Sequence, residues 1–300
     1  MLRLVLNHPL NRQNRVGATG RWAAWQAWKL VIRRPLSIRF WKHLRVRVYP
    51  DWPYSWTAIY LKLAEYDDMT FALRYLRAGE SFLDVGANIG FYSLLASAVN
   101  GGAPVLAFEP HPVAANRLRE NAALNSLANV RVVEAALGDV AGSGQITIDL
   151  FDQNRIATAN DNGLSATVPL VTLDGELPRQ QIDPSKVALV KIDTEGFEAR
   201  VLRGAGSLLA STPGPVWIVE LTGLGLRYGS DDAEVHTLFA QHGYQALRYL
   251  AAENEIAPWE GNDPERGNVI FARDPDHVRA RLGIATQTRV AVPVAASATA

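Results

Sequence analysis

Residues 82–93 constrain the fold more than any other part of this sequence. They open with the apolar run Phe82–Val85, typical of a buried strand, pass through a turn that holds Gly86 and Gly90, and continue with apolar residues at helical spacing. A strand, a glycine turn and a helix in this order present backbone N–H groups to a ligand in α/β proteins. Asp84 stands at the end of the strand, where a carboxylate can meet a cationic or hydroxyl-bearing ligand.

A second apolar run strengthens this interpretation. Val105–Phe108 reads as another buried strand, and it is followed by Glu109, nineteen residues after Gly90. An acid at that place can accept hydrogen bonds from both hydroxyls of a ribose, as in many nucleoside-cofactor sites. The two strand ends together predict a nucleoside-cofactor site.

Five motifs occur in the order and rough spacing of a known family, and the chain resembles the FkbM-type S-adenosylmethionine-dependent methyltransferases. The resemblance covers about residues 65–273, and the joint occurrence of the first and last motifs is its specific part. It implies methyl transfer to oxygen, typically to a hydroxyl of a sugar, glycolipid or polyketide. The motifs are Asp84–Gly90, Phe108–Pro112, Asn121–Asn125, Ala136–Asp139 and Lys191–Glu198.

Composition narrows the class of protein. Three hundred residues with 48% hydrophobic content fit one α/β domain with extensions. The absence of cysteine excludes disulfides, a thiolate nucleophile and cysteine metal sites. No apolar run approaches the ~18 residues of a membrane span. The apolar stretch at the start of the sequence is too short for a signal peptide. We therefore expect a cytoplasmic protein.

The charge is segregated along the chain. Residues 1–50 contain 11 Lys/Arg and no Asp/Glu, so the remainder holds 19 basic and 30 acidic residues, a balance of −11. An acidic catalytic region disfavours nucleic acid as the substrate. This argument does not apply to the N-terminal segment, because that segment is basic.

Residues 1–60 form a basic, Trp-rich N-terminal extension, with a helix expected over 21–32. Such a segment can lie at the inner face of a membrane as a peripheral contact, or stack on a sugar or a lipid-linked substrate. The plainer interpretation, which we favour, is that its tryptophans pack on the protein's own domain or on a partner subunit. Six of the eight tryptophans fall here: Trp22, Trp25, Trp28, Trp41, Trp52 and Trp56.

Residues 61–282 are expected to form the methyltransferase domain. Strands alternate with helices, which predicts a mainly parallel sheet with helices on both faces. The segments 244–250 and 268–273 are spaced as a closing antiparallel pair, which matches the reversed edge of a seven-stranded, Rossmann-like class I methyltransferase sheet. Residues 283–300 lack periodicity and are predicted to be a disordered tail.

An inserted hairpin is predicted between Gln145–Leu150 and Ala166–Val171. The connection between them, Phe151–Ser165, is polar and rich in Asn, Asp and Gly. It is either a mobile lid over the substrate or a surface loop without a role.

The expected cofactor is S-adenosyl-L-methionine, lying across the carboxyl ends of the strands. We expect the glycine turn to line its methionine and ribose portion, Asp84 to approach the methionine ammonium, and Glu109 to accept the ribose hydroxyls. His111 and Ala136 are expected to flank the adenine. The full set of predicted cofactor residues is Asp84, Gly86, Asn88, Gly90, Glu109, His111 and Ala136.

An alcohol acceptor needs a general base or a metal ion to remove its proton. Asp193 is the first candidate for the base, Glu195 and Glu220 are the next, and His111 is a weaker one. Asp193 and Glu220 end neighbouring strands, so they could instead hold a divalent, Mg²⁺-like cation with the acceptor oxygen. We favour metal-free base catalysis and assign no metal ligands.

Other classes of protein stay open. The chain could methylate RNA or protein, or it could be a cofactor-binding module without catalysis. An NAD-dependent oxidoreductase is disfavoured, because the turn lacks the G-x-G-x-x-G spacing and no Tyr-x-x-x-Lys pair accompanies it. We expect a small-molecule or glycan hydroxyl as the acceptor and no nucleic-acid partner.

Overall fold

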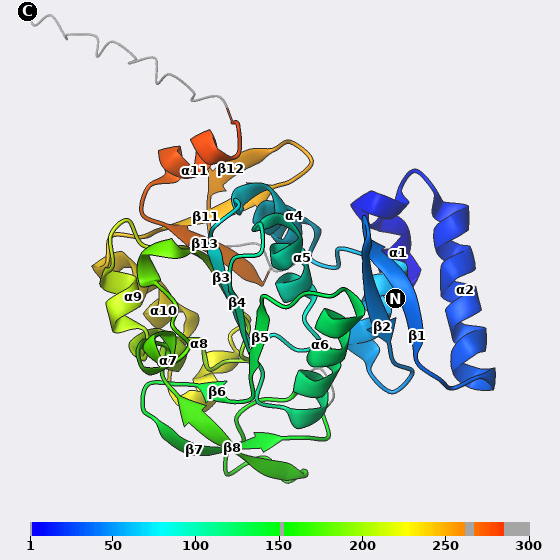
Figure 1. Ribbon diagram of the computed structural model, residues 1–300, viewed down its shortest axis with the longest axis horizontal. Helices are drawn as coiled ribbons and strands as arrows, with labels where there is room; N and C mark the ends of the chain where they lie inside the picture. The colour runs from blue at the N-terminus through cyan, green and yellow to red at the C-terminus, as the bar shows by residue number, and fades with distance from the viewer. Residues whose placement is uncertain (1, 151–152, 262–266, 285–300) are drawn as a thin grey trace, which may run out of the picture.

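The structure is a computed structural model that describes residues 2–150, 153–261 and 267–284 (Figure 1). A central sheet lies between two layers of helices, and the N-terminal residues form a lobe beside α6 at one side of the molecule. The tail predicted at residues 283–300 lies outside the described residues, apart from Gly283 and Ile284.

The central sheet has eight strands in the order β12-β11-β13-β10-β9-β3-β4-β5. Neighbours from β10 to β5 are parallel, while β13 lies antiparallel between β10 and β11. The structure thus confirms the seven predicted strands of the class I methyltransferase sheet. The bounds are β3 Ser81–Val85, β4 Val105–Phe108, β5 Val130–Val133, β9 Val187–Ile192, β10 Val216–Glu220, β11 Gln245–Leu250, β12 Glu255–Pro258 and β13 Asn268–Ala272.

The eighth strand, β12, extends the edge of the sheet and was not predicted. It pairs antiparallel with β11, and Asn254 adopts a positive φ of 52° at the turn between them. Asparagine tolerates this left-handed conformation better than most residues. Ile256 is buried, but a four-residue strand is too short to show an alternating pattern in the sequence.

Two groups of helices cover the sheet. α4 and α5 pack on one face through residues such as Phe71 and Leu94, and α7 to α10 pack on the other through residues such as Leu202 and Phe239. The bounds are α3 Thr57–Tyr60, α4 Tyr66–Tyr75, α5 Phe91–Val99, α6 Pro112–Leu124, α7 Leu173–Arg179, α8 Glu198–Arg203, α9 Gly206–Ala210, α10 Asp232–Gln241 and α11 Pro275–Arg281.

The N-terminal extension contains α1 (Leu2–Asn7), α2 (Arg15–Val31) and a hairpin of β1 (Leu36–Trp41) with β2 (Leu44–Val48). The helix is longer than expected, and the hairpin was not predicted. Trp25 and Trp52 are buried, and the other four tryptophans are half-buried against the same core. The tryptophans therefore pack on the chain's own domain.

Asn121 of α6 and Asn125, the residue that caps its C-terminus, attach this hairpin to the domain. Asn121 Oδ1 accepts a hydrogen bond from Arg47 N at 2.8 Å, and Asn125 Oδ1 accepts one from Arg45 N at 2.7 Å. Asn121 Nδ2 also donates to Ile89 O at 2.9 Å. Asn121 thus bridges the edge of β2 and the glycine turn, which gives this part of the Asn121–Asn125 motif a structural role.

The inserted hairpin is confirmed as part of a second sheet, of order β6-β8-β7, with β6 Ala136–Leu137, β7 Gly142–Thr147 and β8 Ser165–Val171. β7 and β8 are antiparallel, with Gln145 opposite Thr167. In the predicted lid loop, residues 151–152 lie outside the described ranges. Within those ranges, no helix combines the length and the hydropathy needed to cross a bilayer.

Candidate active site

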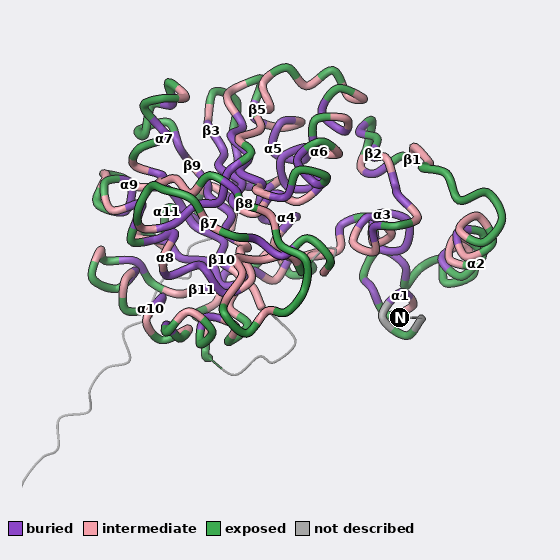
Figure 2. Tube along the Cα trace, turned by 90° about the horizontal axis from the view of Figure 1, so that it is seen from below, coloured by how far each residue is buried: buried purple, intermediate pink, exposed green. Residues whose placement is uncertain are grey.

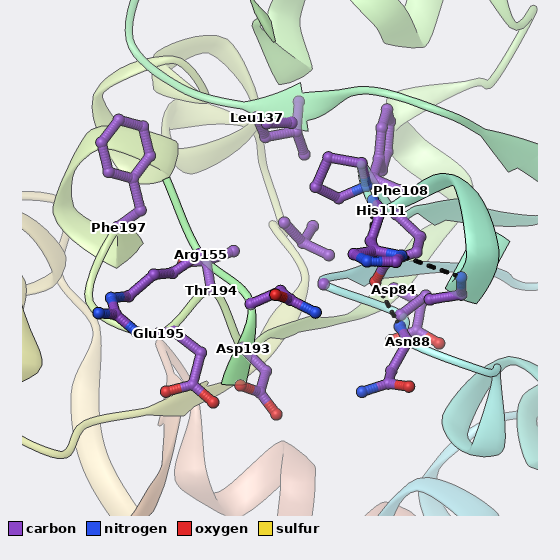
Figure 3. A pocket seen from close by; sticks show the side chains of 18 of the residues that line it. Asp84, Asn88, Phe108, His111, Leu137, Arg155, Asp193, Thr194, Glu195 and Phe197 are labelled. Carbon is purple, nitrogen blue, oxygen red and sulfur yellow. Dashed lines mark hydrogen bonds between the residues drawn. The ribbon is translucent and has the colours of Figure 1, made fainter. Parts of the chain in front are cut away.

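A cavity of about 260 Å³ opens at the carboxyl ends of β3, β4, β9 and β10 (Figure 3). Of the predicted site residues, Gly90 alone is absent from its wall; it begins α5 with φ of 92°, and a Cβ there would lie 2.7 Å from Leu118 Cγ. The cavity brings together the other nine: Asp84, Gly86, Asn88, Glu109, His111, Ala136, Asp193, Glu195 and Glu220.

Gly86 allows two strand ends to approach each other. Its φ is 78°, and a Cβ at this position would lie only 1.7 Å from Asp193 O. A residue with a side chain would push β3 away from β9. The glycine therefore holds Asp84 and Asp193 at the same edge of the cavity.

The Glu109 carboxylate is held by backbone donors on both oxygens. Its Oε2 accepts a hydrogen bond from Asn88 N at 2.7 Å, and its Oε1 accepts one from His111 N at 2.8 Å. Burial raises the pKa of Glu109 to about 7, against the opposing effect of these two N–H groups. A buried carboxylate fixed in this way on the cavity wall suits a ligand that supplies hydroxyl donors.

Asp84 is similarly enclosed. Its Oδ2 accepts a hydrogen bond from Ser93 Oγ at 2.6 Å. Burial raises the pKa of Asp84 to about 6, while Ser93 and the Lys191 ammonium act in the opposite direction. A cationic group placed in the cavity beside Asp84 would favour its ionised form.

His111 caps α6 on the wall that also holds Ala136. Its Nδ1 accepts a hydrogen bond from Ala114 N at 3.4 Å, and its ring lies edge-on to Trp52 with centroids 5.4 Å apart. Burial lowers the pKa of His111, which favours the neutral form of its ring. Phe108 and Leu137 line the cavity as well, which makes this region suitable for a flat aromatic base.

Three carboxylates meet at another part of the cavity. Asp193, Glu195 and Glu220 each offer an oxygen within 4.8 Å of the others. The negative charge of Asp193 raises the pKa of Glu220 well above its usual range, and burial adds to that effect. The Glu220 carboxyl therefore keeps its proton to a higher pH than an isolated glutamate does.

Glu195 and Glu198 have separate roles in the turn after β9. Glu198 Oε1 accepts hydrogen bonds from Thr194 N at 3.1 Å and from Gly196 N at 3.0 Å, so it fixes the turn. Glu195, with φ of 55°, lines the cavity. The turn thus presents Glu195 to the site rather than using it as a cap.

Lys191 is a site residue that the sequence analysis missed. Its side chain is almost fully buried in β9, with Nζ 2.9 Å from Asn268 Oδ1 and 3.5 Å from Asp193 Oδ2. Burial lowers its pKa, but nearby carboxylates, including Asp193 and Glu65, outweigh that effect and raise it. The signal was present, since Lys191 interrupts an otherwise apolar strand.

This ammonium bears on the choice between a base and a metal. Carboxylate oxygens such as those of Asp193, Glu195 and Glu220 suit a hard cation. The Lys191 ammonium, however, already pairs with Asp193 and would repel a second cation there. The donor set therefore fits a proton acceptor better than a divalent metal ion.

The extension and the lid loop also reach the cavity. Trp52 and Tyr54 line it, although we had placed residues 1–60 outside the catalytic domain, and no spacing marked them as site residues. Asn154 and Arg155 line it from the loop, and Tyr228 OH donates a hydrogen bond to Ile156 O at 2.6 Å. Residues 153–156 of the loop therefore form part of the cavity wall.

Comparison with known proteins identifies the family. Residues 84–246, more than half of the chain, match the model of the methyltransferase FkbM domain. The chain belongs to the FkbM methyltransferase family. The matched segment of this FkbM protein includes Asp84 and Glu109 as well as Asp193 and Glu220, the acids that line the cavity.

Two curated relatives of this FkbM protein carry methyltransferase names. Hexuronic acid methyltransferase AglP of Haloferax volcanii is 30% identical over 149 residues, 49% of this chain and 59% of the relative. The 31-O-demethyl-FK506 methyltransferase FkbM of Streptomyces tacrolimicus is 31% identical over 161 residues, 43% of this chain and 60% of the relative. The chain thus spans about three fifths of the length of these relatives.

Among solved structures, an S-adenosylmethionine-dependent O-methyltransferase of Thermotoga maritima is similar at 11% identity. The match covers 68% of this chain and 63% of that one, with a TM-score of 0.37.

Proposed function

We propose that this protein is an S-adenosylmethionine-dependent O-methyltransferase whose acceptor is a hydroxyl of a sugar, a glycolipid or a polyketide-type natural product. Membership of the FkbM family supports this proposal, as do the two relatives, whose names specify methylation of a hexuronic acid and of demethyl-FK506. When bound, the cofactor supplies a methyl group already activated on a sulfonium. The protein then has to bind the cofactor, align the acceptor hydroxyl with its methyl group and remove the proton of that hydroxyl.

The observation that carries the proposal is the position of two kinds of carboxylate in one cavity. Glu109 is fixed by two backbone N–H groups, a suitable acceptor for ribose hydroxyls, while Asp84 lies at the end of the adjacent strand, suitable for an ammonium group. Asp193 and Glu220 lie at the ends of the next two strands, and the negative charge of Asp193 raises the pKa of Glu220. One cavity thus offers both a nucleoside-cofactor site and a proton acceptor.

Asp193 is the residue we propose as the general base. Its side chain is 30% exposed, so an incoming hydroxyl can reach it, and Lys191 at 3.5 Å stabilises its charge. Glu220 and Glu195 flank it in the same cluster. A hydroxyl hydrogen-bonded to Asp193 would lose its proton to this cluster as the oxygen attacks the methyl group.

The charge of the cavity supports a neutral or cationic acceptor. The wall carries the carboxylates of Asp193, Glu195, Glu220 and Glu65, opposed by Lys191 and Arg155. A polyanion such as RNA would be repelled by this excess of acid. We therefore retain a glycan or small-molecule hydroxyl as the acceptor, with the loop from Gln153 to Ser165 as its cover.

A binding experiment followed by methyl transfer tests the proposal. Thermal unfolding is measured with saturating S-adenosylhomocysteine, which stabilises the fold by about 2.7 kcal/mol at 100 times its dissociation constant. We expect Asp84→Ala and Glu109→Ala to lose the shift and Asp193→Asn to keep it. Asp193→Asn should then fail to transfer a radiolabelled methyl group from S-adenosylmethionine to a glycan or lipid extract. Full transfer by this variant would rule out Asp193 as the base.

The labelled product also reports on the acceptor atom. A methyl ether formed on a hydroxyl resists mild alkali, whereas a methyl ester formed on a carboxylate is released as methanol. We expect alkali-stable label. Release of the label would show methylation of a carboxylate instead.

A further inference from the structure

Three consecutive apolar side chains are exposed at the end of α2. Leu30 is 71% exposed, Val31 80% and Ile32 43%. Figure 2 shows α2 at the outer edge of the N-terminal lobe, away from the central sheet. Exposed apolar residues are ordinary when they are scattered singly, but a contiguous group on a projecting element marks an interaction surface.

Specific hydrogen bonds fix the turn at this end of the helix. Trp28 O accepts hydrogen bonds from Ile32 N at 2.9 Å and Arg33 N at 3.2 Å, and Trp28 Nε1 donates to Arg34 O at 2.8 Å. Arg33 takes a positive φ of 54°, which reverses the chain. The apolar residues are thus held outside the fold by specific contacts.

The turn lies in a basic segment of the chain. Arg33 and Arg34 are exposed beside the apolar residues, and Arg39 and Lys42 are exposed on the following hairpin. Residues 1–50 contain no Asp or Glu, and the two acids that line a pocket with Arg33 are paired elsewhere, Asp51 with Arg117 and Glu120 with Arg47. Lys29 is already engaged, since its Nζ lies 3.6 Å from the ring centroid of Trp56.

We propose that the α2 tip, residues 29–34, docks this protein onto an anionic lipid surface, with Leu30 and Val31 entering the interface and the arginines contacting headgroups. Apolar side chains followed by exposed arginines suit the boundary between headgroups and acyl chains. A second copy of the chain would place two basic helix ends together, and their like charges would repel each other. An RNA backbone would satisfy the arginines and leave the apolar residues in water.

Vesicle binding tests this proposal independently of methyl transfer. The full chain is sedimented with phosphatidylcholine vesicles and with vesicles of phosphatidylcholine mixed with phosphatidylglycerol. The test variant is Leu30→Ser/Val31→Ser. The matched control is Val140→Ser/Leu226→Ser, which removes two apolar side chains that are 66% and 72% exposed elsewhere on the molecule.

We expect the unaltered chain and the control variant to bind the anionic vesicles, and the tip variant to bind at least about tenfold more weakly with an unchanged melting temperature. Arg33→Gln and Arg34→Gln should each weaken binding about fivefold, and added salt should do the same. Equal loss in the control variant, or no preference for anionic vesicles, would overturn the proposal. Self-association that the tip variant abolishes, without vesicle binding, would assign the surface to a second copy instead.

Discussion

The indole Nε1 of Trp52 donates a hydrogen bond of 2.9 Å to Oδ1 of Asn88. This contact joins the N-terminal extension to the glycine turn, whose backbone holds Glu109 through Asn88 N. The cavity wall is therefore completed by a residue 36 positions upstream of the turn that it supports.

Trp52→Phe is expected to weaken cofactor binding while leaving the fold intact. The phenylalanine ring keeps much of the packing against His111 but cannot donate to Asn88, and a neutral hydrogen bond contributes about 0.5–1.5 kcal/mol. The dissociation constant for S-adenosylhomocysteine should rise about two- to tenfold in calorimetric titration. Trp41→Phe, on the hairpin strand β1, serves as the control. Equal affinity in Trp52→Phe and the unaltered chain would contradict a supporting role for this bond.

Asn121→Ala is expected to lower the free energy of unfolding by about 2–3 kcal/mol. The substitution leaves Arg47 N and Ile89 O without their partner at a fully buried position, and unsatisfied buried groups are costly. Urea unfolding measures the change. Asn116→Ala, which removes an exposed bond to Glu120 on the same helix, should cost less than about 1 kcal/mol. Similar losses in the two variants would show that the bridge is unimportant.

The free energy of unfolding should decrease as the pH rises from about 5 to 8. The pKa of Glu109 is raised from 4.5 to about 7 and that of Asp84 from 3.8 to about 6, so the folded state binds more protons than the unfolded state in this range. The stabilisation is fully present below the unfolded pKa and is lost as the pH passes the folded pKa.

Urea unfolding at several pH values measures this slope. Glu109→Gln is neutral at every pH and should flatten the curve between about pH 5 and 7. Glu134→Gln, at an exposed position, is the control. An unchanged slope in Glu109→Gln would mean that Glu109 titrates normally in the folded protein.

Lys191→Met is expected to destabilise the fold by about 3–5 kcal/mol, because it leaves buried carboxylates without their cation. Asp68, whose pKa burial raises to about 7, and Asp193 both lose an attractive partner. Chemical denaturation measures the loss, which should grow with pH as Asp68 ionises. Lys186→Met, at an exposed position before β9, should change the stability by less than about 0.5 kcal/mol. A similarly small effect at Lys191 would show that the buried acids are mostly protonated.

We propose that the extension is not separable from the catalytic domain. Phe40 stacks on Phe91 with centroids 4.8 Å apart, and Trp25 belongs to the same buried cluster as Leu94. A fragment starting at residue 61 should therefore expose apolar surface and aggregate in size-exclusion chromatography. A monomeric fragment with a cooperative thermal transition would restore the boundary expected from the sequence.

The strand-end acids and the glycine turn could be predicted from the sequence because their arrangement follows from local rules. Apolar runs such as Val105–Phe108 mark buried parallel strands, and parallel strands bring their carboxyl ends to one edge. Asp84, Glu109 and Asp193 consequently meet in one cavity, whichever details of packing surround them.

Other features depended on tertiary contacts between segments far apart in the chain. Asn268 lies 77 residues from Lys191, and Trp52 reaches the site because α6 binds the edge of β2. The residues around Asn268 and Trp52 show no local pattern that marks either as a site residue. The buried Lys191 ammonium is tolerated only because acids from distant segments surround it. The sequence by itself determined the sheet and the acids at its edge, and the tertiary structure decided which distant side chains neutralise and enclose them.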